Sequence, residues 1–114
     1  MGQIVVLTMS GTHEKLDALG DRHEVIVVEP RWPECQQRLE ALTPGLVIVD
    51  GEHAPSHGRT VARWMASLGR FRTVPFLFLE VADRDMSRVK RDVPRASFGT
   101  WSSVVGTSGR LVKE

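Results

Sequence analysis

The sequence predicts an α/β three-layer sandwich around a five-stranded parallel sheet. Five short runs of aliphatic and β-branched residues recur along the 114 residues, and amphipathic segments separate them. The runs are almost continuously apolar, which is typical of parallel strands buried on both faces. Strand–helix alternation at this spacing favours right-handed crossovers. For such a sheet we expect strand order 2-1-3-4-5. The alternative is another α+β arrangement of the same elements.

The first two strands are expected at residues 4–7 and 25–28. Between them, Thr12 can cap a short helix that Gly20 ends, because glycine readily adopts the left-handed backbone of a helix C-terminus. A second helix can start at Pro33, whose fixed φ suits a first helical turn. These elements make one strand–helix–strand unit followed by the next crossover helix.

The third strand is expected at residues 46–50, after a Thr-Pro-Gly sequence that ends the second helix. An amphipathic helix then runs to Gly69. The fourth strand is expected at residues 74–79, a helix at about residues 85–93, and a weaker fifth strand at residues 96–101.

Residues 1–101 are expected to form this α/β domain, with residues 102–114 as a short terminal helix or tail of the same domain. Gly106 and Gly109 make a poor helix interior, so the last helix is expected to be short or missing.

Composition indicates a soluble, cytoplasmic protein. Cys35 is the only cysteine, which excludes an internal disulfide and suits a reducing compartment. It falls on the inner face of its helix, so we interpret it as a core residue. No apolar run approaches the roughly 20 residues of a membrane helix, and no leader peptide is evident.

Charge is distributed unevenly along the chain. Residues 1–57 hold 4 basic and 9 acidic side chains, a net −5, and residues 58–114 hold 11 and 5, a net +6. Opposed surface fields in one domain favour oriented docking to a partner. The overall net charge of +1 makes nucleic acid an unlikely partner.

Candidate functional residues follow the strands, because ligands of open α/β sheets bind beyond the carboxyl ends of the strands. The residues expected at that edge are Thr8, Met9, Ser10, Asp50, Glu52, Glu80, Thr100 and Trp101.

Two segments carry a resemblance to a known family. In "PGLVIVDGEHAPSHGRTVARWM" a strand ends in Asp50 and a loop leads into an amphipathic helix, and "TVPFLFLEV" follows as a fourth strand. The chain resembles the CheY-like receiver domain of two-component response regulators, over nearly its whole length in element order. The resemblance implies a flavodoxin-like fold, a signalling role in a phosphorelay, and Asp50 as the phosphoacceptor.

The rest of the receiver site is not kept. Receivers hold Mg²⁺ partly through an acidic pair, which aligns with Thr8 and Met9. Their hydroxyl position falls on Glu80, and their lysine on Thr100 or Trp101. Since Mg²⁺ prefers hard carboxylate oxygens, we interpret the chain as a degenerate pseudo-receiver. We expect a non-enzymatic module without a cofactor, which binds a kinase, an output protein or a second copy of itself.

Two alternatives remain open. One is a phosphorylatable receiver that uses Asp50 with Mg²⁺, in which Glu52 or Glu80 replaces the missing ligands. The other is a small metal-dependent enzyme built on Asp50, Glu52, His53 and His57, which lie within eight residues. A strand-end aspartate can also simply cap the following loop.

A basic stripe is the remaining candidate surface. Arginines recur at steps of four, three and four, on the face opposite the apolar side of the helix expected at residues 85–93. Such a stripe is either a docking surface for an acidic partner or simply the solvated outer face of the helix. The stripe comprises Arg84, Arg88, Arg91 and Arg95. Trp101, at the rim of the sheet, could also anchor a partner.

Overall fold

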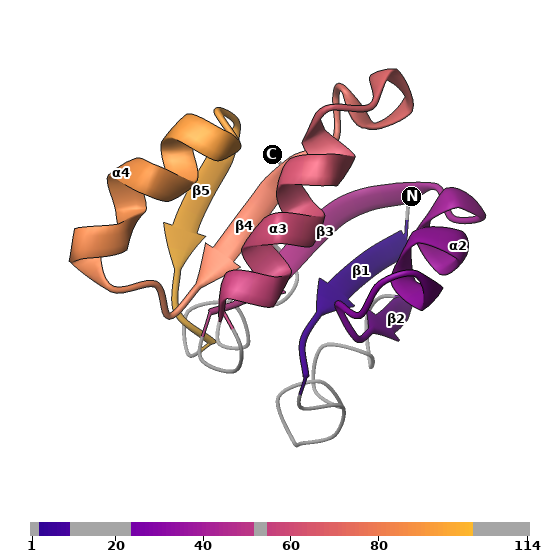
Figure 1. Cartoon of the computed structure of the whole chain (residues 1–114), viewed down its shortest axis with the longest axis horizontal. Coiled ribbons are helices and arrows are strands. Elements are labelled where there is room, and N and C mark those ends of the chain that lie inside the picture. Colours follow the sequence, from indigo (N-terminus) through magenta and orange to yellow (C-terminus); the bar gives the residue numbers. More distant parts are fainter. Residues whose placement is uncertain (1–2, 10–23, 52–54, 102–114) are drawn as a thin grey trace.

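A computed structural model describes residues 3–9, 24–51 and 55–101 of the chain. Five strands form one parallel sheet with the predicted order β2-β1-β3-β4-β5 (Figure 1). The strands are β1 (Gln3–Leu7), β2 (Val25–Val28), β3 (Pro44–Asp50), β4 (Phe76–Leu79) and β5 (Ala96–Gly99).

In the described ranges, the α-helices lie on one face of the sheet (Figure 1). They are α2 (Glu34–Glu40), α3 (Pro55–Ala66) and α4 (Asp83–Asp92), and a single 3₁₀ turn, η1 (Gly69–Phe71), follows α3. Each helix turns its apolar stripe to the sheet, and the buried positions are Cys35 and Leu39 on α2, Val61 and Met65 on α3, and Val89 on α4. Burial of these side chains against β1, β3 and β4 holds this layer in place.

The central crossover is packed tightly where α3 passes over β3. A Cβ added at Gly58 would lie 2.8 Å from Cγ1 of Val49, closer than real contacts allow. A residue without a side chain is therefore required there, and α3 begins at Pro55, whose fixed φ suits a first turn. This packing fixes how α3 leaves the carboxyl end of β3.

A second apolar cluster lies on the opposite face of the sheet. It combines side chains of β1, β3 and β4 with the indole of Trp101, and its members are Ile4, Val6, Leu46, Ile48, Leu79 and Trp101. The helix expected from Thr12 and the terminal residues 102–114 lie outside the described residues.

Several boundaries differ from prediction. Strand β3 begins at Pro44, where a helix stop was expected, and Pro44 pairs with Gln3 of β1 at a register shift. Proline is tolerated there because the first residue of a strand can do without its N–H group. Strand β5 ends at Gly99 instead of continuing to residue 101. In the part of the chain that the structure describes, no helix is long and apolar enough to cross a bilayer.

Candidate functional site

Asp50 ends the central strand β3, at the edge where the parallel strands all have their carboxyl ends. Its side chain is only 1% exposed. A carboxylate removed from water at this degree of burial is costly unless polar groups replace its hydration. The contacts that replace it define the site.

Thr8, directly after β1, supplies the first contact. Its hydroxyl Oγ1 donates a hydrogen bond to Oδ2 of Asp50 over 2.7 Å, and both side chains are buried. The parallel pairing of β1 with β3 sets Leu7 opposite Val49, so Thr8 and Asp50 follow as neighbours. The position that the resemblance assigns to an acidic metal ligand is therefore held by a hydroxyl donor.

Trp101 supplies the second contact. Its indole Nε1 donates to Oδ1 of Asp50 over 3.4 Å, and the side chain is 1% exposed. The expectation that Trp101 sits at the rim and anchors a partner is wrong, because β5 ends at Gly99 and the indole turns into the second apolar cluster. Sequence reasoning placed Trp101 in the pocket but missed its role as the donor to Asp50.

Glu80 holds the backbone of the same tryptophan. Its Oε2 accepts a hydrogen bond from the backbone N–H of Trp101 over 2.7 Å, and its own N–H donates to the carbonyl of Gly99 over 3.0 Å. The backbone of Glu80 has φ 60°, a left-handed conformation that is uncommon for a residue with a side chain. This turn directs Glu80 toward the end of β5.

Together these contacts join four strand ends through one buried carboxylate and one tryptophan. Asp50 and Glu80 both accept hydrogen bonds from Trp101, one from the indole and one from the main chain. Hydrogen bonds to a charged acceptor are stronger than those between neutral groups. The arrangement thus uses Asp50 as an acceptor that organises the edge of the sheet.

The other predicted site residues are dispersed or not described. Met9 is half-buried and Thr100 is exposed, whereas Ser10, Glu52 and His53 lie outside the described residues. His57 lies on α3 and is exposed, in contrast to the buried Asp50. Among residues 3–9, 24–51 and 55–101, no three His, Cys, Asp or Glu side chains gather in a way that could hold a metal ion.

The arginine stripe is shorter than predicted. Arg84, Arg88 and Arg91 are exposed on α4. Arg95 lies beyond the end of the helix, and its guanidinium donates to the carbonyls of Val74 (3.1 Å) and Phe71 (2.9 Å). Arg95 is therefore a structural residue that ties the start of β5 to the loop before β4, because the helix stops at Asp92.

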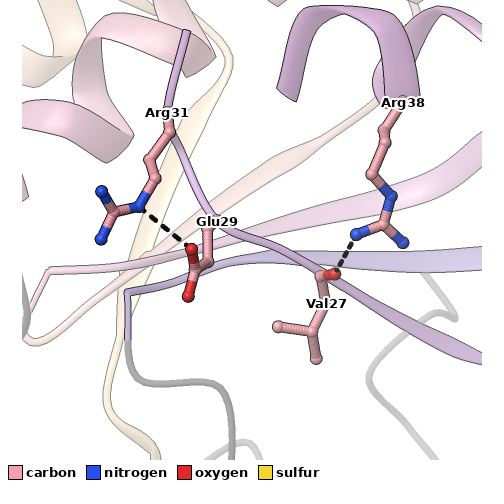
Figure 2. A network of polar contacts seen from close by, with 4 residues as sticks. All are labelled: Val27, Glu29, Arg31 and Arg38. Carbon is pink, nitrogen blue, oxygen red and sulfur yellow. Dashed lines mark hydrogen bonds and ion pairs between the residues drawn. The ribbon is translucent and has the colours of Figure 1, made fainter. Parts of the chain in front are cut away.

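The outer edge of the sheet, at β2, carries a second polar network (Figure 2). Arg38 of α2 donates to the carbonyl of Val27 over 3.1 Å, and Arg31 pairs with Glu29 over 3.1 Å. An arginine that occupies an edge carbonyl discourages pairing with another strand. These residues border a cavity of about 500 Å³ beside Trp32, whose side chain is 43% exposed.

Cys35 lies at this end of the core, as predicted. Its side chain is buried on α2. Burial raises the pKa of the Cys35 thiol above its ordinary value of 9.0, since the thiolate would lose its hydration, although nearby backbone N–H groups act in the opposite direction. A thiol of this kind is a poor nucleophile at neutral pH.

Comparison with solved structures confirms the fold. The chain superposes with a TM-score of 0.71 on the signal receiver domain of a signal transduction histidine kinase from Syntrophus aciditrophicus. The two share 21% sequence identity, and the alignment covers 98% of this chain and 90% of the other. No family model and no curated protein matches the sequence. The chain therefore has the receiver-domain fold that its sequence predicts.

Proposed function

We propose that this chain is a receiver-like signalling module that acts by binding another protein, without normal phosphorylation of Asp50. The fold that it shares with the receiver domain of a histidine kinase supports the signalling role. One observation carries the rest of the proposal: the buried Asp50 carboxylate accepts hydrogen bonds on both oxygens, from Thr8 and from Trp101.

The chemistry of these donors argues against metal-assisted transfer to Asp50. Mg²⁺ requires several oxygen ligands in near-octahedral geometry and favours carboxylates. A neutral hydroxyl (Thr8) and a half-buried thioether (Met9) occupy the positions that the resemblance assigns to the acidic pair. Glu80, which could compensate, already accepts the backbone N–H of Trp101. A phosphoryl group would therefore add charge at a site where the positions assigned to the acidic pair offer no carboxylates to hold a balancing metal ion.

The surface that we propose for the partner lies between α4 and β5. A groove of about 460 Å³ is lined there by Met86 of α4 and Phe98 of β5. Arg84, Arg88 and Arg91 are exposed on the same helix. The groove, whose lining also includes Glu80 and Asp83, suits an apolar anchor of the partner, whereas the arginine face of α4 suits an acidic part of the partner's surface. The partner classes that we propose are a cytoplasmic kinase, an output protein or a second copy of this chain.

The rival function is a phosphorylatable receiver with Mg²⁺ at Asp50. It requires Glu52, outside the described residues, or Glu80, engaged with Trp101, to supply the metal ligands. The second alternative, a small metal-dependent enzyme, requires the side chains of Asp50, Glu52, His53 and His57 to converge on one metal ion. Elemental analysis of freshly purified protein for zinc, manganese and iron tests this alternative. We favour the non-enzymatic module because Asp50 is buried and His57 is exposed.

Intact-mass measurement after incubation with Mg²⁺ and acetyl phosphate tests the proposal. We expect the mass of the unmodified chain, in wild type and in Asp50→Asn alike. A stoichiometric phosphate adduct in the wild type that disappears in Asp50→Asn would establish the rival. A receiver domain with the complete acidic site, treated in parallel, shows that the donor is active.

A further inference from the structure

Trp32 lies in the loop between β2 and α2, at the outer edge of the sheet, and its side chain is 43% exposed. In the described ranges it is the one large hydrophobic side chain that is exposed to solvent. A single exposed apolar side chain is common on protein surfaces and needs no function. The surroundings of Trp32 therefore decide whether it is a docking residue.

The indole of Trp32 is held in one orientation within the single chain. It packs edge-to-face against the half-buried Trp64 of α3, with ring centres 5.4 Å apart and ring planes at 86°. Pro30 and Pro33 restrict the loop on both sides of the tryptophan, because each proline fixes its own φ. An aromatic side chain that is already ordered loses little entropy on binding, so it is suited to anchor a partner.

A cavity of about 500 Å³ lies directly beside this tryptophan. Trp32 forms part of its lining, together with Val28 of β2 and Cys35 of α2. The volume falls within the roughly 300–1,000 Å³ of pockets for drug-sized ligands, so the cavity has room for an indole. One surface therefore presents both an ordered aromatic side chain and a hollow that can receive one.

The charged side chains around this cavity balance. Two glutamates and two arginines line it, namely Glu29, Glu34, Arg31 and Arg38. Glu29 and Arg31 pair with each other over 3.1 Å, whereas Arg38 donates to the carbonyl of Val27 (Figure 2). Across residues 3–9, 24–51 and 55–101, neither Glu34 nor Arg38 lies within ion-pair distance of an oppositely charged side chain. One anion and one cation of the lining thus remain available to a partner.

We propose that the Trp32 surface, formed by Trp32 and the cavity lining from β2 and α2, binds the same surface of a second copy of this chain about a two-fold axis. In such a contact every feature meets its complement twice. Trp32 of each copy enters the cavity of the other. A surface can face its own copy only if it does not repel itself, and the equal numbers of glutamate and arginine in the lining satisfy this condition.

Glu34 and Arg38 supply the polar half of the proposed contact. They are four residues apart on α2, so their side chains lie on the same face of the helix. With the two α2 helices antiparallel across the axis, Glu34 of each copy faces Arg38 of the other. The contact therefore pairs the two charges that have no ion-pair partner within one copy, around an aromatic anchor of the type that dominates many interfaces.

Sedimentation velocity of the full chain between about 10 µM and about 1 mM tests the proposal. We expect a dimer with a dissociation constant on the order of 100 µM, since one aromatic anchor per copy carries most of the contact. Trp32→Ala should weaken association by at least about tenfold. Met86→Ala is the matched control, because it removes an apolar side chain from the groove between α4 and β5, and it should leave the dissociation constant within about twofold.

Charge reversal identifies the paired residues. Glu34→Lys alone and Arg38→Glu alone each set like charges opposite one another at both ends of the contact, so each variant should stay monomeric up to about 1 mM. An equimolar mixture of the two variants restores opposite charges at both ends, and it should dimerise within about threefold of the wild-type affinity. Circular dichroism of each variant checks that the fold is kept.

A wild-type chain that stays monomeric at about 1 mM would overturn the proposal and leave the Trp32 surface to a different protein or to a small molecule. So would a dimer that Met86→Ala weakens and Trp32→Ala does not, or folded charge variants whose mixture stays monomeric. If a charge variant does not fold, the comparison of Trp32→Ala with Met86→Ala decides. The outcome is separate from the proposed function, because it depends neither on phosphorylation of Asp50 nor on the groove between α4 and β5.

Discussion

The indole Nε1 of Trp101 donates a hydrogen bond to Oδ1 of Asp50, although 51 positions separate the two residues in the chain. The same tryptophan donates its backbone N–H to Glu80. With Thr8 on the second oxygen of Asp50, the ends of β1, β3 and β4 and the segment after β5 are linked. In this domain a tryptophan holds the position that the receiver resemblance gives to lysine or to its neighbour.

Replacing Trp101 by phenylalanine should destabilise the fold. Trp101→Phe keeps an aromatic ring but removes the N–H donor, so one oxygen of the buried Asp50 loses a partner. We expect the free energy of unfolding to fall by about 1–3 kcal/mol. Urea unfolding measures it. Trp32→Phe is the control, because Trp32 is 43% exposed and should change stability by about 0.5 kcal/mol. If the two substitutions lower the free energy of unfolding equally, the hydrogen bond from the Trp101 indole to Asp50 does not stabilise the fold.

Replacing Thr8 by valine preserves the shape of the side chain and deletes only its hydroxyl. We expect Thr8→Val to cost about 1–3 kcal/mol, since Oδ2 of Asp50 loses its hydrogen bond in a buried setting. The exposed Thr73→Val should cost about 0.5 kcal/mol or less. A double-mutant cycle with Asp50→Asn should give a coupling of about 0.5–3 kcal/mol. Additive effects would show that the two side chains do not interact.

Replacing Arg95 by glutamine should destabilise the domain more than the same change at Arg91. Arg95 donates to two carbonyls and lies 5.7 Å from the ring centre of Phe76. We expect Arg95→Gln to cost about 1–2 kcal/mol and the exposed Arg91→Gln about 0.5 kcal/mol or less. Thermal unfolding of the two variants measures the difference. If Arg95→Gln is as stable as wild type, the arginine is part of the solvated stripe after all.

Stability should also depend on pH through Cys35. Its thiol pKa is raised in the folded state, so its contribution to stability is present below the ordinary value of 9.0 and is lost as pH rises through the folded pKa. The free energy of unfolding should therefore fall from about pH 8 to about pH 10 more steeply in wild type than in Cys35→Ala. Urea unfolding across this range measures both slopes. Parallel slopes would mean that the thiol titrates equally in the folded and unfolded chains.

Much of the fold could be predicted from the sequence because its strands are buried on both faces. The run that ends in Asp50 is apolar from Leu46 to Val49, and that pattern is typical of a parallel strand that is covered on both faces. The element boundaries were less predictable. The sequence pattern predicts that Pro44 lies in the segment that ends the preceding helix, but Pro44 is the first residue of β3. Proline is tolerated at this position because the first residue of a strand does not need its N–H group.

The site was predictable as a location but not as a set of contacts. Strand order alone brings Thr8 and Asp50 to the same edge. The orientation of Trp101 depends on β5 ending at Gly99, which no local pattern specifies. Similarly, the spacing that groups Arg95 with Arg91 ignores the end of α4 at Asp92.

The central claim is that the Asp50 carboxylate stabilises this edge as a hydrogen-bond acceptor, and urea unfolding of Asp50→Asn tests it most directly. Asparagine keeps one acceptor oxygen, so its amide NH₂ would face either the Thr8 hydroxyl or the Trp101 indole. We predict that the free energy of unfolding falls by about 1–3 kcal/mol. Unchanged or increased stability would contradict the account, because that result is expected when neutralisation relieves repulsion in an acidic metal-binding cluster.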